Sequence, residues 1–78
     1  MTAEDVKSLQ EALNRLMNAG LKVDGIIGPL TRSAIKDFQA QSGLLADGVV
    51  GQKTSDALDN ALSERGFGIL EWFKSLFK

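Results

Sequence analysis

The sequence contains no cysteine and no histidine, and its 78 residues include one proline and one tryptophan. Without cysteine the fold cannot be stabilised by disulfides, and without cysteine or histidine it lacks the usual zinc ligands. Packing of its own apolar side chains must therefore stabilise the chain, and no cofactor is expected. A chain of this length forms one domain, because it cannot bury two independent cores.

Neither sign of charge is in excess, since nine Lys and Arg residues oppose ten Asp and Glu residues. Nucleic-acid binding needs a surplus of positive charge, so nucleic acid is not an expected partner. No apolar stretch approaches the length of a bilayer span, and residues 1–5 lack the basic and apolar segments of a Sec-type signal peptide. If its target lies outside the cytoplasm, we expect the chain to use another route or to be part of a longer protein.

Apolar residues at helical spacing predict a first helix at residues 3–18. Thr2 and Asp5 have the spacing of a capping box and are expected to start this helix. Gly20 is expected to end it, because glycine adopts the left-handed conformation without a steric penalty from Cβ.

Two further helices are expected, one from Pro29 to about residues 42–43 and one at residues 52–63. Proline suits the first helical turn, where its missing N–H would have no helical partner. The inward face of the second helix is expected to contain Leu30, Ala34, Ile35 and Phe38. That of the third is expected to contain Ala57, Leu58, Ala61 and Leu62.

The segments that lead into these two helices resemble each other when the sequence is shifted by 23 residues. The shift places Asp24-Gly25 on Asp47-Gly48, Gly28 on Gly51, Thr31 on Thr54 and Ala34 on Ala57. The pairs Ile26-Ile27 and Val49-Val50 also coincide. This pattern predicts an internal repeat with an Asp-Gly-x-x-Gly turn in each copy.

Each residue type in this turn has an expected structural role. The Asp accepts hydrogen bonds from backbone N–H groups, and Gly25 and Gly48 adopt positive φ. The two apolar residues that follow pack inward, Gly28 and Gly51 allow close approach to a neighbouring helix, and the threonine hydroxyls bond to the loop. Neither copy has the closely spaced oxygen ligands of an EF-hand loop, so calcium is not expected.

The whole pattern resembles the peptidoglycan-binding domain, a three-helix module found beside cell-wall amidases, carboxypeptidases, muramidases and phage endolysins. The matching segments are residues 6–13 (VKSLQEAL), 23–39 (VDGIIGPLTRSAIKDFQ) and 47–54 (DGVVGQKT). The resemblance implies a compact all-α bundle at residues 1–65 that binds peptidoglycan and is located in the cell wall or periplasm or is associated with a phage. The same fold occurs in pro-segments of animal matrix metalloproteinases, which bind no cell wall, so the fold alone does not establish the function.

The expected function is non-catalytic binding of peptidoglycan, which targets a cell-wall hydrolase or a phage or envelope assembly to the wall. The expected ligand-binding residues are Asp24, Thr31, Arg32, Lys36, Gln39, Asp47, Gln52, Lys53 and Thr54. The side chains of Arg32, Lys36, Gln39, Gln41, Asp47, Gln52 and Lys53 are expected to be exposed, and Phe38 is expected in the core. Ser55 stands where the family often has an aromatic residue, which we expect to weaken stacking on sugar rings.

Catalysis is not expected, because the chain has no cysteine or histidine for a nucleophile–base pair or a metal site. Its acidic residues are expected on a helix face or in turns. No pair of carboxylates is expected to face each other across a cleft, as glycoside hydrolysis requires.

Residues 66–78 have a different composition, with four of the five aromatic residues of the chain. Their spacing predicts a short amphipathic fourth helix. In one interpretation this helix packs on the bundle or on a partner subunit. In the other it lies at a membrane interface through Trp72, Phe73 and Phe77. The tail therefore leaves two alternatives open: a structural protein of the same fold that docks through this helix, and a membrane-active peptide carried on a helical domain.

Overall fold

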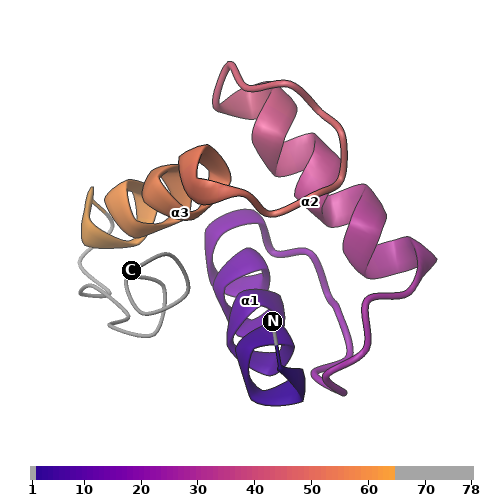
Figure 1. The fold of residues 1–78 in the computed structure, drawn as a ribbon. Coiled ribbons are helices and arrows are strands. Elements are labelled where there is room, and N and C mark those ends of the chain that lie inside the picture. The colour runs from indigo at the N-terminus through magenta and orange to yellow at the C-terminus, as the bar shows by residue number, and fades with distance from the viewer. Residues whose placement is uncertain (1, 65–78) are drawn as a thin grey trace.

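A computed structural model describes residues 2–64, which form three helices: α1 (Ala3–Met17), α2 (Pro29–Gln41) and α3 (Gln52–Glu64). The fold is all-helical, as the sequence predicts, and no strand occurs in this described part (Figure 1). None of its helices is long and apolar enough to cross a membrane. The predicted fourth helix, with Trp72, Phe73 and Phe77, lies outside the described residues.

Helix α1 starts and ends on side-chain and backbone signals that are local in the sequence. The Thr2 N–H donates to Oδ2 of Asp5 at 3.0 Å, and the Asp5 N–H donates to the Thr2 hydroxyl at 3.2 Å, which completes the expected capping box. The helix ends at Asn18, which has a φ of 53° and whose N–H donates to the carbonyl of Asn14. The prediction that Gly20 ends α1 is wrong, because asparagine also tolerates the left-handed conformation and comes first.

The loop after α1 is fixed to that helix by one side chain. The Asn14 amide donates to the carbonyl of Leu21 at 2.9 Å, and the Leu21 N–H donates to Oδ1 of Asn14 at 2.7 Å. Leu21 is thereby held against the apolar core. The loop therefore returns along α1 and brings the first Asp-Gly turn toward the start of that helix (Figure 1).

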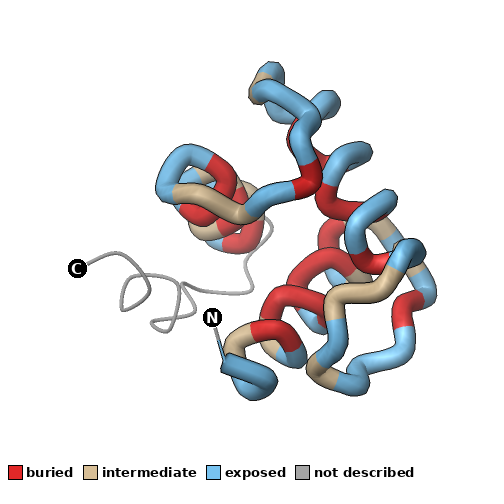
Figure 2. The backbone as a smooth tube through the Cα atoms, turned by 45° about the vertical axis from the view of Figure 1, so that its right-hand side comes forward, coloured by how far each residue is buried: buried red, intermediate tan, exposed pale blue. Residues whose placement is uncertain are grey.

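The apolar core lies between α1 and the two other helices, both of which contact α1. Figure 2 shows the buried segments on the sides of the helices that face one another. Phe38 is 5% exposed and belongs to this core, as expected. The core consists of Leu9, Ala12, Leu13, Leu16, Leu21, Ala34, Ile35, Phe38, Leu58 and Leu62.

One residue expected in the core lies outside it. Leu30 is 78% exposed, whereas its neighbour Thr31 is 5% exposed. The buried face of α2 is centred on Thr31, Ile35 and Phe38, which recur at helical spacing, and Leu30 lies beside that face in the first helical turn. The hydroxyl of Thr31 has a buried hydrogen-bond partner in Gln10, which explains why a polar residue occupies the inward position.

Candidate functional site

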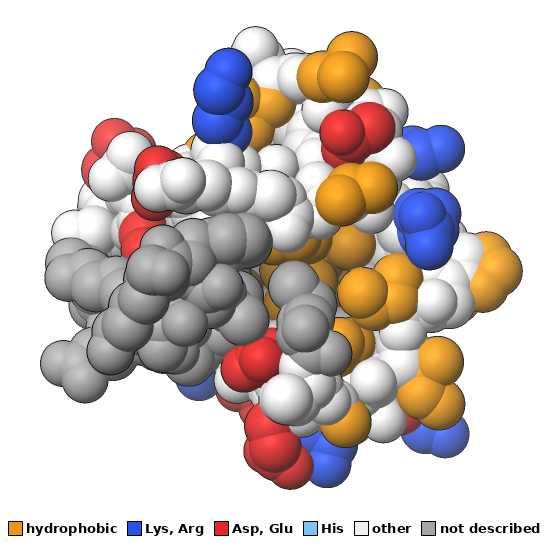
Figure 3. Space-filling model, viewed as in Figure 1, with side chains coloured by type: hydrophobic (Ala, Val, Ile, Leu, Met, Phe, Trp, Pro, Cys, Tyr) orange, Lys and Arg blue, Asp and Glu red, His pale blue; other side chains and the backbone are white. Residues whose placement is uncertain are grey.

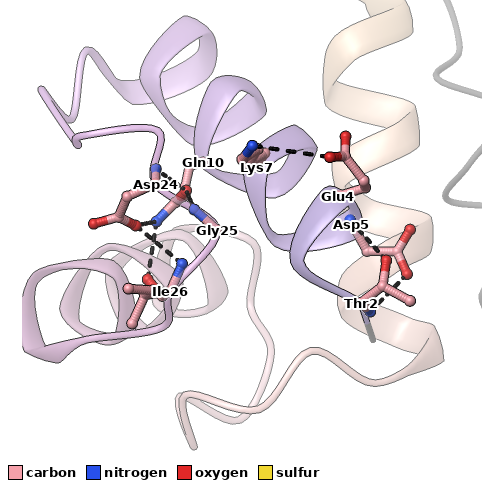
Figure 4. Close-up of polar contacts among 8 residues, drawn as sticks. All are labelled: Thr2, Glu4, Asp5, Lys7, Gln10, Asp24, Gly25 and Ile26. Atoms are coloured by element: carbon pink, nitrogen blue, oxygen red, sulfur yellow. Dashed lines mark hydrogen bonds and ion pairs between the residues drawn. The ribbon is translucent and has the colours of Figure 1, made fainter.

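The first turn, residues 24–28, is held by the buried side chain of Gln10 on α1, which is 1% exposed. Its Nε2 donates to Oδ1 of Asp24 at 3.0 Å, to the carbonyl of Ile26 at 3.0 Å and to the hydroxyl of Thr31 at 3.1 Å. Its Oε1 accepts from the N–H groups of Asp24 and Gly25 at 3.0 Å each (Figure 4). One amide therefore joins α1, the turn and the start of α2.

The second turn, residues 47–51, is held in the same way by Gln39 on α2. Its Nε2 donates to Oδ1 of Asp47 at 3.0 Å, to the carbonyl of Val49 at 2.9 Å and to the hydroxyl of Thr54 at 3.0 Å. Its Oε1 accepts from the Gly48 N–H at 2.9 Å. Each helix thus holds the turn that leads into the next helix.

Within each turn the Asp carboxylate has the expected role. Oδ1 of Asp24 accepts from the Ile26 N–H, and Oδ1 of Asp47 accepts from the Val49 N–H, both at 2.9 Å. Hydrogen bonds to the charged form favour it. The Gln10 amide and the Ile26 N–H lower the pKa of Asp24, and the Val49 N–H and the Gln39 amide lower the pKa of Asp47. Both side chains are therefore ionised at neutral pH.

The four glycines of the turns have roles that agree only in part with those expected. Gly25 and Gly48 have φ values of 78° and 75°, as predicted. They also make the close approaches: a Cβ at Gly25 would lie 3.0 Å from the carbonyl oxygen of Ala3, and one at Gly48 would lie 2.9 Å from Cγ of Arg32. A Cβ at Gly28 or Gly51 would have no neighbour within 4 Å. The close contacts predicted for Gly28 and Gly51 are therefore wrong, because these glycines lie at helix starts that face open space.

Of the two apolar residues that follow Gly25, and of the two that follow Gly48, only the second packs inward. Ile26 is 66% exposed and Val49 is 59% exposed, whereas Ile27 and Val50 are partly buried. The N–H and carbonyl groups of Ile26 and Val49 bond to the Asp and Gln of the turn. This pairing fixes their backbone with the side chains toward solvent, so the prediction that they plug the core is wrong.

An open groove with a volume of about 540 Å³ lies beside the second turn. We call it the second-turn groove. Its exposed members offer an amide, an ammonium, a carboxylate and two apolar side chains: Gln52, Lys53, Asp47, Leu45 and Val49. The other lining residues are Gln39, Gly43, Leu44, Gly51 and Thr54.

Of the other residues expected to bind a ligand, Arg32 and Lys36 are exposed on α2. Their aliphatic stems lie against Gly48, because Cε of Lys36 would be 3.2 Å from a Cβ at that glycine. Asp24 is exposed in the first turn. The second turn therefore brings Arg32 and Lys36 against Gly48, the residue after Asp47, which the sequence separates from them by more than ten positions.

Three predicted site residues lie inside the fold. Thr31 and Thr54 are each 5% exposed, and Gln39 is 1% exposed, so the expectation that Gln39 is exposed is wrong. The reason is the set of hydrogen bonds that its amide makes to the second turn. Ser55 is 2% exposed and does not line the groove, so the position expected to offer sugar stacking faces the interior instead.

Sequence reasoning did not assign a site role to Gln10. A glutamine in a helix is most often exposed, so burial is not the default expectation. A usable signal exists, because Leu9-Gln10 and Phe38-Gln39 each place a glutamine after a core residue and before an Asp-Gly turn. The separation from Gln to Asp is 14 residues in the first case and 8 in the second. The 23-residue shift that aligns the two turns therefore does not align the two glutamines.

Residues 2–64 contain no group of three or more acidic, histidine or cysteine side chains placed to hold a metal ion. The amide, ammonium, carboxylate and apolar groups around the second-turn groove are suited to hydrogen bonding, ion pairing and apolar contact.

Comparison with known proteins matches residues 2–58 to the model of the peptidoglycan binding domain family. A 37-residue stretch is 54% identical to part of the autolytic lysozyme of Clostridium acetobutylicum. This stretch covers 47% of the present chain and 11% of that protein, so the similarity concerns a small part of the lysozyme. No solved structure matches the chain.

Proposed function

The chain belongs to the peptidoglycan binding domain family, and we propose that it binds peptidoglycan without catalysis through the second-turn groove. The observation that carries this proposal is the groove itself: it is open, lined by exposed groups of several chemical kinds, and built on a turn that a buried glutamine holds in place. A rigid support of this kind lowers the entropy lost when a ligand binds.

The exposed groups of the groove match the chemistry of the wall polymer. Peptidoglycan presents sugar hydroxyls, N-acetyl groups, peptide carboxylates and, in some walls, free ammonium groups. The Gln52 amide can pair with hydroxyl and acetamido groups, and Leu45 and Val49 can contact methyl groups. Oδ1 of Asp47 is bonded within the turn, and its second oxygen has no hydrogen bond among the described residues, so it can accept from a ligand.

The charges around the groove favour the peptide part of the polymer. Lys53 lines the groove, and the stems of Arg32 and Lys36 lie against Gly48, the residue after Asp47. One cation and one carboxylate therefore line the groove, and two further cations contact the turn that supports it. An arginine or lysine pairs strongly with a carboxylate, so we assign the stem-peptide carboxylates of peptidoglycan to this positive side.

Weak contacts suffice for a module of this kind if it is attached to a partner. The wall presents many copies of the same unit, and a tether converts repeated binding into an effective concentration on the order of millimolar. Because a short stretch of the autolytic lysozyme resembles this chain, we propose that the module directs a cell-wall hydrolase, or a phage or envelope assembly, to the wall.

No catalytic role is assigned to the groove. One oxygen of Asp47 is committed to the turn, and hydrogen bonds hold the pKa of this carboxyl below its usual range, which is opposite to the raised pKa of a general acid. The chain contains no histidine or cysteine. Binding is thus the activity that these side chains support.

Co-sedimentation with purified sacculi tests the proposal. The wild-type chain is expected to pellet with sacculi, and the Gln52→Ala, Lys53→Ala double variant is expected to bind on the order of tenfold more weakly, which is about 1.4 kcal/mol. The control carries Asp56→Ala and Asn60→Ala, two exposed positions on the same helix that do not line the groove. Failure of the wild-type chain to pellet with sacculi of every wall chemotype, while its circular dichroism shows a folded helical protein, would overturn the proposed function.

A further inference from the structure

The first turn forms a depression of its own, with a volume of about 160 Å³. Eight residues line it, and each lies 23 positions before a residue that lines the second-turn groove. We call it the first-turn depression. The two hollows therefore occupy equivalent places, each between an Asp-Gly turn and the start of the helix that follows.

The two hollows also share their support. In both turns a buried glutamine donates to the Asp carboxylate, to the carbonyl two residues later and to the threonine of the next helix. Asp24, like Asp47, has one oxygen bonded inside the turn and is exposed. The backbone at the rim is therefore fixed in the same way in both places.

The side chains at the rims differ in chemistry. Pro29 and Leu30 of the first-turn depression stand where the second-turn groove has Gln52 and Lys53. Leu30 is 78% exposed, so its apolar side chain is available to a ligand at this rim. The helix start in the first-turn depression is thus the more apolar and suits methyl groups and sugar faces, whereas Lys22, which stands where the second-turn groove has Leu45, places one cation among the lining residues of the depression.

Helix α2 connects the two hollows along one side of the molecule. Thr31, at its start, lines the first, and Gln39, near its end, lines the second. Thr31 and Gln39 are eight positions apart in α2, which corresponds to about 12 Å along the helix axis. Arg32 and Lys36 lie between them with their stems on the second turn, and Figure 3 shows hydrophobic side chains separated by charged ones over this region.

We propose that the first-turn depression is a second subsite for the same N-acetylated glycan–peptide polymer, so that one chain contacts the wall at two places, one near each end of α2. This inference rests on the proposed function. It follows from the equivalent position and support of the two hollows and from the exposed apolar surface of Ile26 and Leu30 at the first one. Two linked contacts raise the affinity for a long polymer above that for a short fragment.

The contributions of the two subsites to binding can be distinguished by substituting one residue in each, at two equivalent positions. Leu30→Glu changes the first subsite and Lys53→Glu changes the second. Both residues are exposed in the first turn of a helix, where an acidic side chain favours the helix. Ile26→Ser serves as a second change at the first subsite, because Ile26 is 66% exposed. The probe is a purified disaccharide tetrapeptide, followed by backbone amide shifts of the labelled full chain, together with co-sedimentation of each variant with sacculi.

When the disaccharide tetrapeptide is added to the wild-type chain, the backbone amide signals of both turns are expected to shift. Leu30→Glu and Ile26→Ser are each expected to remove the shifts of the first turn only, and Lys53→Glu those of the second turn only. Affinity for sacculi is expected to exceed that for the short probe by on the order of a hundredfold, and each variant is expected to lose most of this excess.

Two other results have distinct meanings. Shifts at the second turn alone, with sacculus affinity unchanged in Leu30→Glu and Ile26→Ser, would overturn the second subsite and leave the proposed function in place. Absence of shifts at both turns together with no pelleting of the folded wild-type chain would overturn both proposals.

Discussion

Gln39 is almost fully buried, with 1% of the residue exposed, and its amide donates hydrogen bonds to three groups and accepts one. An uncharged side chain is suited to this place, because it offers a donor and an acceptor on one short planar group without the cost of burying a charge. Gln10 repeats the arrangement at the first turn. The geometry of the candidate site therefore depends on residues that do not themselves reach solvent.

Replacing Gln39 by Met is expected to lower the free energy of unfolding by about 3 kcal/mol. Methionine has nearly the same length and packs well, but it leaves the Gly48 N–H and the Val49 carbonyl without their partner. Gln41→Met on the same helix is the control, because Gln41 is exposed. Urea unfolding measures both, and equal stability of the two variants would contradict the role assigned to Gln39.

At the scale of the element, each turn is a joint between two helices, with its first glycine against the preceding helix and its last glycine at the start of the following one. The first glycine of each turn, Gly25 or Gly48, combines a positive φ with a close neighbour. The last glycine, Gly28 or Gly51, has open space where a Cβ would stand. The two kinds of glycine should therefore respond differently to the same substitution.

Alanine at Gly25 or Gly48 is expected to destabilise the fold by about 1–2 kcal/mol, because the left-handed conformation is costly for a residue with a Cβ. The loss is expected to be larger at Gly25, where the near atom is the backbone carbonyl of Ala3, than at Gly48, where it belongs to the flexible side chain of Arg32. Gly28→Ala and Gly51→Ala are expected to change stability by less than about 0.5 kcal/mol. Thermal unfolding of the four variants checks this order, and a larger loss at Gly28 than at Gly25 would refute it.

These joints also mark how far the sequence predicts the structure. The three helices, the capping box at Thr2 and the positive φ of Gly25 and Gly48 were predicted, because helical periodicity and turn chemistry are local. The neighbours of each glycine and the outward side chains of Ile26 and Val49 were not, since they depend on where α1 and α2 lie in space. The burial of Gln39 was missed for the same reason, because its partners lie 8 to 15 residues away.

At the scale of the whole molecule, stability rests on a small apolar core and on two polar joints that contain ionised carboxylates. Hydrogen bonds favour the charged forms of Asp24 and Asp47 in the fold and lower the pKa of each below its usual value of about 3.9. Unfolding removes these bonds and restores the usual pKa. Each carboxylate therefore stabilises the fold above about pH 4, and this stabilisation is lost as the pH falls from there through the lowered pKa.

The Asp24→Asn, Asp47→Asn double variant is expected to lose less stability than the wild type between pH 7 and about pH 3. Asparagine keeps a carbonyl oxygen that can accept from the Ile26 and Val49 N–H groups, but it does not titrate. Urea unfolding at the two pH values measures the difference, and Asp56→Asn, on the exposed side of α3, is the control. Identical pH dependence in the wild type and the double variant would show that these carboxylates do not contribute as argued.

The arrangement in which each helix holds the turn that leads into the next also has a consequence for the order in which the chain folds. Gln10 is synthesised before the first turn, and Gln39 before the second, at separations of 8 to 21 residues from their partners. Closing such short loops is fast, and folds dominated by nearby contacts fold rapidly. As the chain emerges from the ribosome, α1 can hold the first turn before α2 is complete, and α2 can then do the same for α3. We expect the two turns to close early in this order and the fold to become stable when α3 packs against α1 and completes the core.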